Sequence, residues 1–288
     1  MPQTNVLVAL KNAVLHQIKE LPNVELDGNN RIQDQGTLLE FLVKDLFVGT
    51  SIGIDDKSSK IAHYRTKLSY LGAKNNPPDF IIRKGAAVEV KKKENTSMSE
   101  IQLNSSFPKD YLYSDDPLLL DACKTCESDI GNWIKKDMIY AIGNISNGNL
   151  LSLFMVYGNC FCADRRVYQR IKDTIKNGVE DISGIQFTPS KELGKVHGID
   201  SLDLTALRIR GMWTITNPYQ HFKSHLNNNW DKTRVQVLMT ESDYNNLENK
   251  PDLTKELNDK SIIMKSITIP DPNNAVKTLK CVLFIAEY

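Results

Sequence analysis

Three ionisable residues, Asp79, Glu89 and Lys91, are spaced so that they can act together on one face of a hairpin. Asp79 precedes a short apolar run, and a turn leads into a second run from 86 to 91. Side chains alternate along a strand, so Glu89 and Lys91 project from one face, which Asp79 approaches if the strands pair. Two carboxylates beside an ammonium can hold a divalent cation and assist attack of water on a phosphodiester. A solvent-facing hairpin that merely carries charges is the alternative interpretation.

Further blocks of sequence extend this pattern into a resemblance that covers most of the chain. A proline–aspartate pair, a spacer and an acid-x-lysine triplet form the pattern of the PD-(D/E)xK nucleases. The chain resembles the NgoPII family of type II restriction endonucleases in blocks at 36–47, 70–72, 76–79, 89–92, 103–109, 136–140 and 207–213. Nothing in 245–274 contributes to this resemblance, so no role is predicted for it.

The resemblance implies an α/β protein with a PD-(D/E)xK restriction-endonuclease-like core, a mixed central sheet flanked by helices, and additional DNA-binding elements. The implied reaction is Mg²⁺-dependent hydrolysis of both strands of double-stranded DNA at a short palindrome, GGCC in the namesake, leaving 5′-phosphates. In this scheme Asp79 and Glu89 bind the metal, while Lys91 positions or activates the water and stabilises the pentacovalent phosphate. A twofold DNA site is met most simply by a homodimer.

Glu40 is a fourth candidate, on an expected helix over 36–48. It lies one helical turn before Lys44, so spacing alone predicts a surface ion pair that contributes little to stability. In PD-(D/E)xK enzymes a helix before the hairpin often supplies an extra acid to the metal site. By resemblance, Glu40 matches that position and is an auxiliary catalytic acid.

Basic and polar residues elsewhere are candidate DNA contacts. Arg208 and Arg210 alternate along an expected strand within 202–215 and would share one face, where arginine can contact guanine or phosphate. An ion-paired sheet surface is the alternative for this pair. The other candidates lie at or soon after the end of the hairpin and can contact DNA or serve as turn and capping residues: Lys92, Lys93, Gln102, Asn104, Ser105 and Ser106.

The five cysteines are an odd number and do not suggest a disulfide framework. Cys123 and Cys126 precede an expected hairpin, and Cys160 and Cys162 follow it, so both pairs would emerge at the same end. Four thiolates there can bind a structural Zn²⁺. Small buried residues beside a sheet are the alternative, which we favour.

The composition is that of an ordinary soluble globular protein, with 41% hydrophobic and 25% charged residues. A net charge of +1 does not itself indicate nucleic-acid binding, so cations must gather locally. No apolar run has transmembrane length, and residues 1–20 follow an amphipathic helical pattern, which together predict a cytoplasmic protein without a membrane partner. A DNA-binding protein that cannot cleave, or a repair nuclease without sequence preference, is the alternative function.

Hydrophobic periodicity predicts mixed strands and helices around one core, as a single domain over 1–288. Residues 95–108 are expected to be a polar stretch. Helices are expected over 4–20, 36–48, 164–177 and 218–226, with another starting near 118. Strands are expected over 80–82, 86–91, 137–142, 150–156, 234–239, 261–269 and 278–286.

Overall fold

One mixed sheet forms the centre of the computed structural model, which describes residues 3–25, 31–190, 193–226, 230–253 and 262–288. Eight strands follow one another in the order β1-β2-β3-β6-β7-β12-β14-β13, and a ninth, β5, pairs with β6. The β3–β6 and β7–β12 pairs are parallel and the others antiparallel. The strands of this sheet are β1 (Leu68–Tyr70), β2 (Phe80–Ile82), β3 (Ala87–Glu94), β5 (Tyr111–Tyr113), β6 (Lys135–Ser146), β7 (Asn149–Tyr157), β12 (Arg234–Thr240), β13 (Ile262–Asp271) and β14 (Asn274–Glu287).

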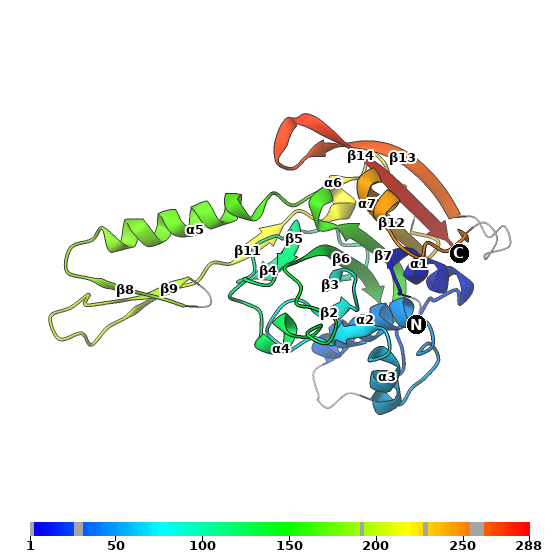
Figure 1. The fold of residues 1–288 in the computed structure, drawn as a ribbon, viewed down its shortest axis with the longest axis horizontal. Helices are drawn as coiled ribbons and strands as arrows, with labels where there is room; N and C mark the ends of the chain where they lie inside the picture. Colours follow the sequence, from blue (N-terminus) through cyan, green and yellow to red (C-terminus); the bar gives the residue numbers. More distant parts are fainter. Residues whose placement is uncertain (1–2, 26–30, 191–192, 227–229, 254–261) are drawn as a thin grey trace.

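Two N-terminal helices, α1 (Val6–Leu15) and α2 (Arg31–Val48), pack on each other and on the sheet (Figure 1). The side chain of Asn5 caps α1 by accepting from two backbone amides of its first turn. The helix is shorter than the 4–20 expected, because Gln17 takes a positive φ of 46° and Ile18 N donates back to Ala13 O.

Contact between α2 and the sheet is close at Gly143. An added Cβ there would lie 2.6 Å from the side chain of Leu39, so a larger residue would push the helix away. The next helix, α3 (Lys57–Tyr64), is joined to α2 by a buried ion pair between Lys60 and Asp45. These contacts fix the helix that carries Glu40 against the strand that carries Glu89.

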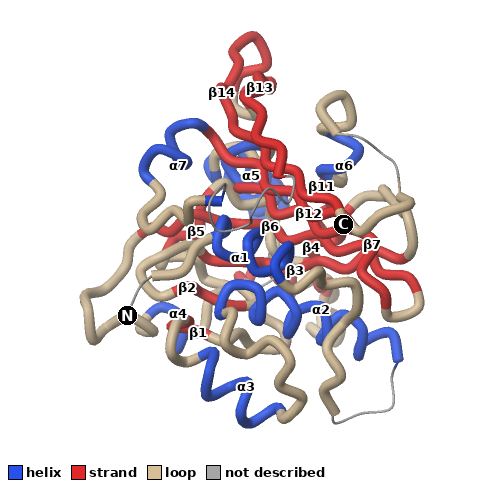
Figure 2. Tube along the Cα trace, turned by 90° about the vertical axis from the view of Figure 1, so that its right-hand side faces the viewer, coloured by secondary structure: helices blue, strands red, loops and turns tan. Residues whose placement is uncertain are grey.

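The expected strands and the hairpin between 137 and 156 are confirmed, and the mixed central sheet flanked by helices is as expected. Residue 261, the predicted start of one strand, lies outside the described residues. The tip of the β13–β14 hairpin projects beyond the body (Figure 2). The described residues contain no helix with the length and apolarity needed to cross a membrane.

An arm extends from the body at one end of the molecule (Figure 1). It consists of helix α5 (Arg165–Glu180) and a three-stranded sheet of β8 (Gln186–Pro189), β9 (Gly194–His197) and β10 (Leu207–Ile209). The predicted helix is confirmed, but its apolar stripe is not buried. Val167, Ile171 and Ile175 are 43%, 44% and 42% exposed.

A second, two-stranded sheet connects the arm to the body. Strand β4 (Ile101–Asn104) pairs antiparallel with β11 (Trp213–Ile215), with Trp213 opposite Asn104. The polar stretch over 95–108 therefore contains a strand that the sequence pattern does not predict. The described residues also form the short helices α4 (Asp121–Lys124), α6 (Pro218–His221) and α7 (Glu241–Asn246) and the 3-10 helix η1 (Gly158–Cys160).

Candidate active site

The β2–β3 hairpin places Asp79 beside Glu89. Phe80 pairs with Val88, and the backbone amide of Asp79 donates to the carbonyl of Val88 at 3.1 Å. The Asp79 carboxylate turns back onto β3, where its Oδ2 accepts from the amide of Val90 at 2.6 Å. Asp79 is thus held at its backbone and at one carboxylate oxygen, and the other oxygen remains for a ligand.

Gly72 makes room for this arrangement. It has a φ of +90°, and a Cβ added there would lie 2.3 Å from the backbone oxygen of Asp79. Any other residue would both strain its own backbone and displace Asp79. The short turn after β1 is therefore part of the scaffold of the site.

Glu89 and Lys91 project from one face of β3, as their spacing predicts, and form an ion pair of 2.7 Å between Lys91 Nζ and Glu89 Oε1. The second oxygen, Glu89 Oε2, is buried without a hydrogen-bond partner among the described residues. A buried carboxylate oxygen normally has a partner, so this one has unmet capacity for a cation or a donor.

Glu40 lies near these residues, paired with Lys44 at 3.8 Å between Lys44 Nζ and Glu40 Oε2. Burial raises the pKa of Glu40 above its ordinary value, and the nearby Glu89 carboxylate adds to the shift against the opposing effect of Lys44. The ion pair that spacing predicts is therefore present, and the role of Glu40 as an auxiliary acid stays a prediction. It pairs with Lys44, and it belongs to the same electrostatic cluster as Glu89.

The pKa values of Asp79 and Lys91 in this cluster are raised, so both groups bind their protons more tightly than usual. Burial raises the pKa of Asp79 well above its ordinary range, and Glu89 and Glu40 raise it further. Burial alone would lower the pKa of Lys91, but the carboxylates of Glu89, Asp79 and Glu40 outweigh burial and raise it. Such a surplus of acids around one cation favours the entry of a further positive charge.

The carboxylate oxygens of Asp79 and Glu89 are the candidate ligands for Mg²⁺. The described residues contain no group of three or more His, Cys, Asp or Glu side chains gathered closely enough to hold a metal ion. Mg²⁺ is usually bound through one or two carboxylates, with waters and substrate phosphates completing its shell. Asp79, with one oxygen held by Val90, and Glu89, with an unpartnered buried oxygen, supply such a pair. The donor set fits the ion.

The predicted DNA contacts near the hairpin fall on two surfaces. Lys92 donates to Gln35 at 3.3 Å and is paired with Glu94, whereas Lys93 donates to Ser99 at 3.0 Å and to a backbone carbonyl. On β4, Gln102 and Asn104 are exposed while their neighbours are buried, and the partly buried Ser105 and Ser106 follow. The outward pair on β4 has the exposure that a DNA contact requires.

Arg208 and Arg210 do not share a strand, which corrects the prediction. Arg208 is exposed on β10 opposite Lys195, and the strand ends at Ile209. The chain then leaves the arm sheet through Gly211 so that Trp213 can pair with β4. Both arginines are exposed, and both take part in interactions within the chain.

The four cysteines do not gather into a site of the expected kind. The segment after Cys126 turns toward β1, where the Cys126 thiol lies 3.6 Å from Ser69 Oγ. Cys160 instead lies against Cys281 of β14. Burial raises the pKa of Cys123 to about 12, as in a plain buried thiol.

Sequence reasoning overlooked two residues. Lys44 donates to the carbonyl of Leu71 at 3.1 Å. Its ammonium also interacts electrostatically with the carboxylates of Glu40 and Asp79. Its position four residues after Glu40 predicts an ion pair on a helix, but that spacing carries no information about Asp79 or Leu71. Tyr140 stands opposite Glu89 in the β3–β6 ladder, and no local pattern signals that long-range pairing.

Most of the chain is similar to a family of restriction endonucleases and to one of its members. A sequence model of the NgoPII restriction endonuclease family matches residues 4–270. The type II restriction enzyme NgoPII of Neisseria gonorrhoeae is 42% identical over 251 residues, which make up 87% of this chain and 88% of that protein. No solved structure matches the chain.

Proposed function

This chain belongs to the NgoPII restriction endonuclease family and is a type II restriction endonuclease, and we propose that it hydrolyses both strands of double-stranded DNA in a Mg²⁺-dependent reaction on a PD-(D/E)xK core. The proposed products carry 5′-phosphates, and the proposed site is a short palindrome, GGCC by its likeness to the family's namesake. The observation that carries the proposal is the unpartnered buried Oε2 of Glu89 beside Asp79 and Lys91.

Asp79 and Glu89 would hold the metal ion. When bound, Mg²⁺ supplies a Lewis acid for the phosphoryl oxygens and lowers the pKa of a bound water. The hairpin prepares both acids by fixing Asp79 to the Val90 amide at 2.6 Å and Glu89 to Lys91 at 2.7 Å. Neither acid then has to be ordered when DNA and metal arrive.

Lys91 orients the attacking water and stabilises the charge that develops on the phosphate. Its raised pKa keeps it protonated, so it acts as a fixed positive charge. Glu40 is an auxiliary acid whose raised pKa brings its titration closer to neutrality, where it can accept a proton from the water. Lys44 holds Glu40 in place through their 3.8 Å pair.

DNA would be contacted by Gln102, Asn104 and neighbouring residues of β4, and by Arg208 and Arg210 on and beside the arm. The observation in support is exposure: the side chains of Gln102, Asn104 and both arginines face outward. We further propose that the enzyme acts in the cytoplasm as a homodimer, because a twofold protein presents two equivalent sites to the two strands of a palindrome.

Digestion of a plasmid of known sequence tests the proposal. Discrete fragments that need Mg²⁺, with ends that map to one palindrome and carry 5′-phosphates, are the expected result. Ligation of the fragments with and without phosphatase treatment identifies the end chemistry. A ladder without discrete ends would indicate a nuclease without sequence preference, and a mobility shift without cleavage would indicate a DNA-binding protein only. Either outcome would overturn the proposed reaction.

A further inference from the structure

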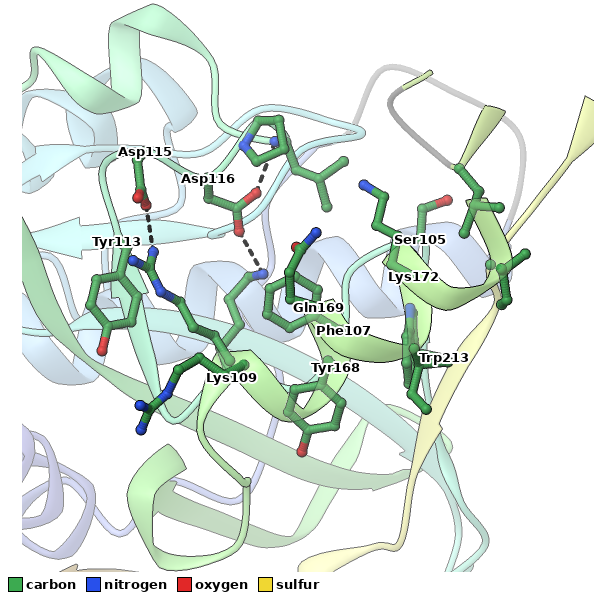
Figure 3. Close-up of a pocket in the computed structure, with 18 of the residues that line it drawn as sticks. Ser105, Phe107, Lys109, Tyr113, Asp115, Asp116, Tyr168, Gln169, Lys172 and Trp213 are labelled. Carbon is green, nitrogen blue, oxygen red and sulfur yellow. Dashed lines mark hydrogen bonds and ion pairs between the residues drawn. The ribbon is translucent and has the colours of Figure 1, made fainter. Parts of the chain in front are cut away.

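A cavity of about 410 Å³ lies where the arm meets the body, outside the cluster of acids (Figure 3). Its walls come from three places along the chain: the segment after β4, the loop after β5, and the first turns of α5. Gly211 and Trp213 close it from the β11 side. Two of the sequence blocks that resemble the restriction enzymes, 103–109 and 207–213, therefore meet at this cavity.

Aromatic rings form one side of the cavity. Phe107 and Tyr168 stack with their centroids 5.6 Å apart and an angle of 19° between the rings. Trp213 meets Tyr168 edge to face at 5.5 Å. All three side chains are drawn around the same space in Figure 3. Ring surfaces of this kind bind flat, apolar groups, and a nucleobase is the flat group that DNA offers.

A buried ion pair supplies polar groups to the same cavity. Lys109 Nζ lies 2.7 Å from Asp116 Oδ2 and 4.0 Å from the centroid of Phe107, and the two charged side chains are 2% and 8% exposed. Apart from this ion pair, Lys109 Nζ has no hydrogen-bond partner in good geometry among the described residues. An ammonium has three donors, so Lys109 can still donate to a carbonyl or ring nitrogen. Asp116 places an acceptor beside it.

Two hydrogen bonds tie this cavity to the candidate active site. The amide of Lys109 donates to the hydroxyl of Tyr140 at 2.8 Å, and Tyr140 is the partner of Glu89 across the β3–β6 ladder. From the other side, the Asn76 amide group donates to the carbonyl of Leu118, which lines the cavity, at 2.7 Å. Paired residues on neighbouring strands project to one side of a sheet, so the Tyr140 hydroxyl that holds Lys109 lies on the same side as Glu89.

Cationic side chains line one side of the cavity, and two of them are paired with acids. Arg165, Arg166 and Lys172 line it from α5. Arg166 is 86% exposed while paired with Asp164, and Arg165 is paired with Asp115 at 2.7 Å. Cations at a rim with aromatic rings below match a nucleotide, whose phosphate stays outside while its base enters.

We infer that this cavity receives a single nucleobase turned out of the DNA helix. The inference rests on the proposed function, because it takes DNA as the substrate. Stacking on Phe107, Tyr168 and Trp213, together with hydrogen bonds to Lys109 and Asp116, replaces the stacking and pairing that the base loses in the duplex. The cavity thereby adds a step of recognition that the acid cluster cannot supply.

The first stage of the test separates the inference from the proposed function. Plasmid digestion locates the cut site, and its failure would remove the proposed function itself. Duplexes that contain the mapped site then carry 2-aminopurine at each position in turn, within the site and beside it. Fluorescence is measured with wild-type protein in the absence of metal ion. Reactivity toward permanganate and chloroacetaldehyde is a second readout, since it detects an unpaired base even when an aromatic ring quenches the fluorophore.

We expect one position, and its symmetry mate, to become fluorescent or reactive when the protein binds. A protein that cleaves its site while every position keeps the signal of the free duplex would overturn the inference and leave the proposed function intact.

A pair of variants on α5 links the signal to the cavity. Gln169 lines the cavity from an exposed position, so Gln169→Trp fills the space without disturbing the core. Thr174→Trp adds the same bulk to an exposed position of the same helix, away from the cavity lining. Gln169→Trp should lose the signal and bind its site roughly 5- to 150-fold more weakly, as expected for one lost base–aromatic stack. Thr174→Trp should retain both.

Two outcomes with these variants would contradict the inference. An unchanged base signal in Gln169→Trp would place the extruded base elsewhere. Loss of self-association in Gln169→Trp, with no base signal in the wild type, would show that the cavity holds a second copy of the chain.

Discussion

Two acid–lysine pairs of this chain have similar chemistry but different surroundings. Glu127 and Lys136 lie 2.9 Å apart and are 5% and 6% exposed. Glu127 Oε1 accepts from Ser69 Oγ at 2.9 Å and from the backbone amide of Lys84 at 2.8 Å, while Oε2 receives Lys136. Every oxygen of this buried acid has a partner within the chain.

The pair of Glu89 and Lys91 does not satisfy both carboxylate oxygens of Glu89. Only Oε1 of Glu89 has a partner, and Oε2 is buried without one among the described residues. Two further acids, Asp79 and Glu40, add negative charge around the same lysine. The difference separates a pair whose groups are all satisfied within the chain from the pair for which we propose a function. The first satisfies its own groups, and the second keeps capacity for something that arrives from outside.

The largest expected effect is on cleavage by Glu89→Gln. Under the proposed function, loss of this carboxylate removes a metal ligand, so cleavage should fall by at least about 10³-fold, the upper range for one preorganised charged group. Binding of the DNA site should persist, because an acid beside phosphate repels it. Single-turnover cleavage and a gel-shift titration measure the two quantities. A Glu89→Gln enzyme as active as its parent would place Glu89 with the structural acids.

The matched substitution in the other pair should affect stability instead. Glu127→Gln leaves the Lys136 charge buried without its counter-ion, which typically costs about 3–5 kcal/mol. Cleavage per folded molecule should be unchanged. Urea unfolding and active-site titration give both numbers. The double variant Glu127→Gln/Lys136→Met is the control and should recover much of the lost stability. If Glu127→Gln lost cleavage without losing stability, the contrast between the pairs would be wrong.

Lys91→Ala should reduce the rate of cleavage by roughly 10²–10³-fold, the usual range for one charge that stabilises a transition state. Its dependence on Mg²⁺ concentration should change little, because the ligands are carboxylates. Single-turnover rates over a series of Mg²⁺ concentrations separate rate from metal affinity. A loss that excess Mg²⁺ repairs would mean that Lys91 serves to arrange the ligands.

The smallest effect concerns stability and pH. Because the pKa of folded Asp79 is raised, the folded state binds its proton more tightly than the unfolded chain does. Stability contributed by this proton is present at low pH and lost as pH rises toward the folded pKa, so ionised Asp79 destabilises the metal-free protein near neutrality. Asp79→Asn should then unfold at a higher temperature at neutral pH, and the difference should shrink on acidification. A constant difference at all pH values would contradict this explanation.

Local patterns were enough to find the hairpin of Asp79, Glu89 and Lys91. Strand alternation fixes which side chains share a face, and the structure places these three as predicted. The strands β4 and β11 were a different matter, since β4 was missed altogether. They pair residues about a hundred positions apart. Because Gln102 and Asn104 are polar, the sequence of β4 resembles that of a polar loop. The contacts between strands that are distant in sequence leave no local signal.

The cysteines show a second limit. The start of β6 and the end of β7 do lie together at the open end of their hairpin, where Ile139 pairs with Tyr157. The hydrophobic pattern of the two strands does not predict where the chain runs before β6 and after β7, and the four cysteines lie in those segments. Cys126 begins the segment that packs on β1, and Cys160 ends a short 3-10 helix with its thiol against Cys281 of β14. Two correct strands therefore led to a wrong cluster.

Gly72 also bears on how such genes decay. Every amino-acid replacement that arises from a single nucleotide change in a glycine codon introduces a Cβ, and at this position a Cβ would lie 2.3 Å from the backbone oxygen of Asp79. A single nucleotide change in this codon can therefore disturb the candidate site without altering any of its three ionisable residues. The resulting protein would still read Asp79, Glu89 and Lys91 in full. A relative that carries all three residues but lacks this glycine should be assayed before it is counted as an active nuclease.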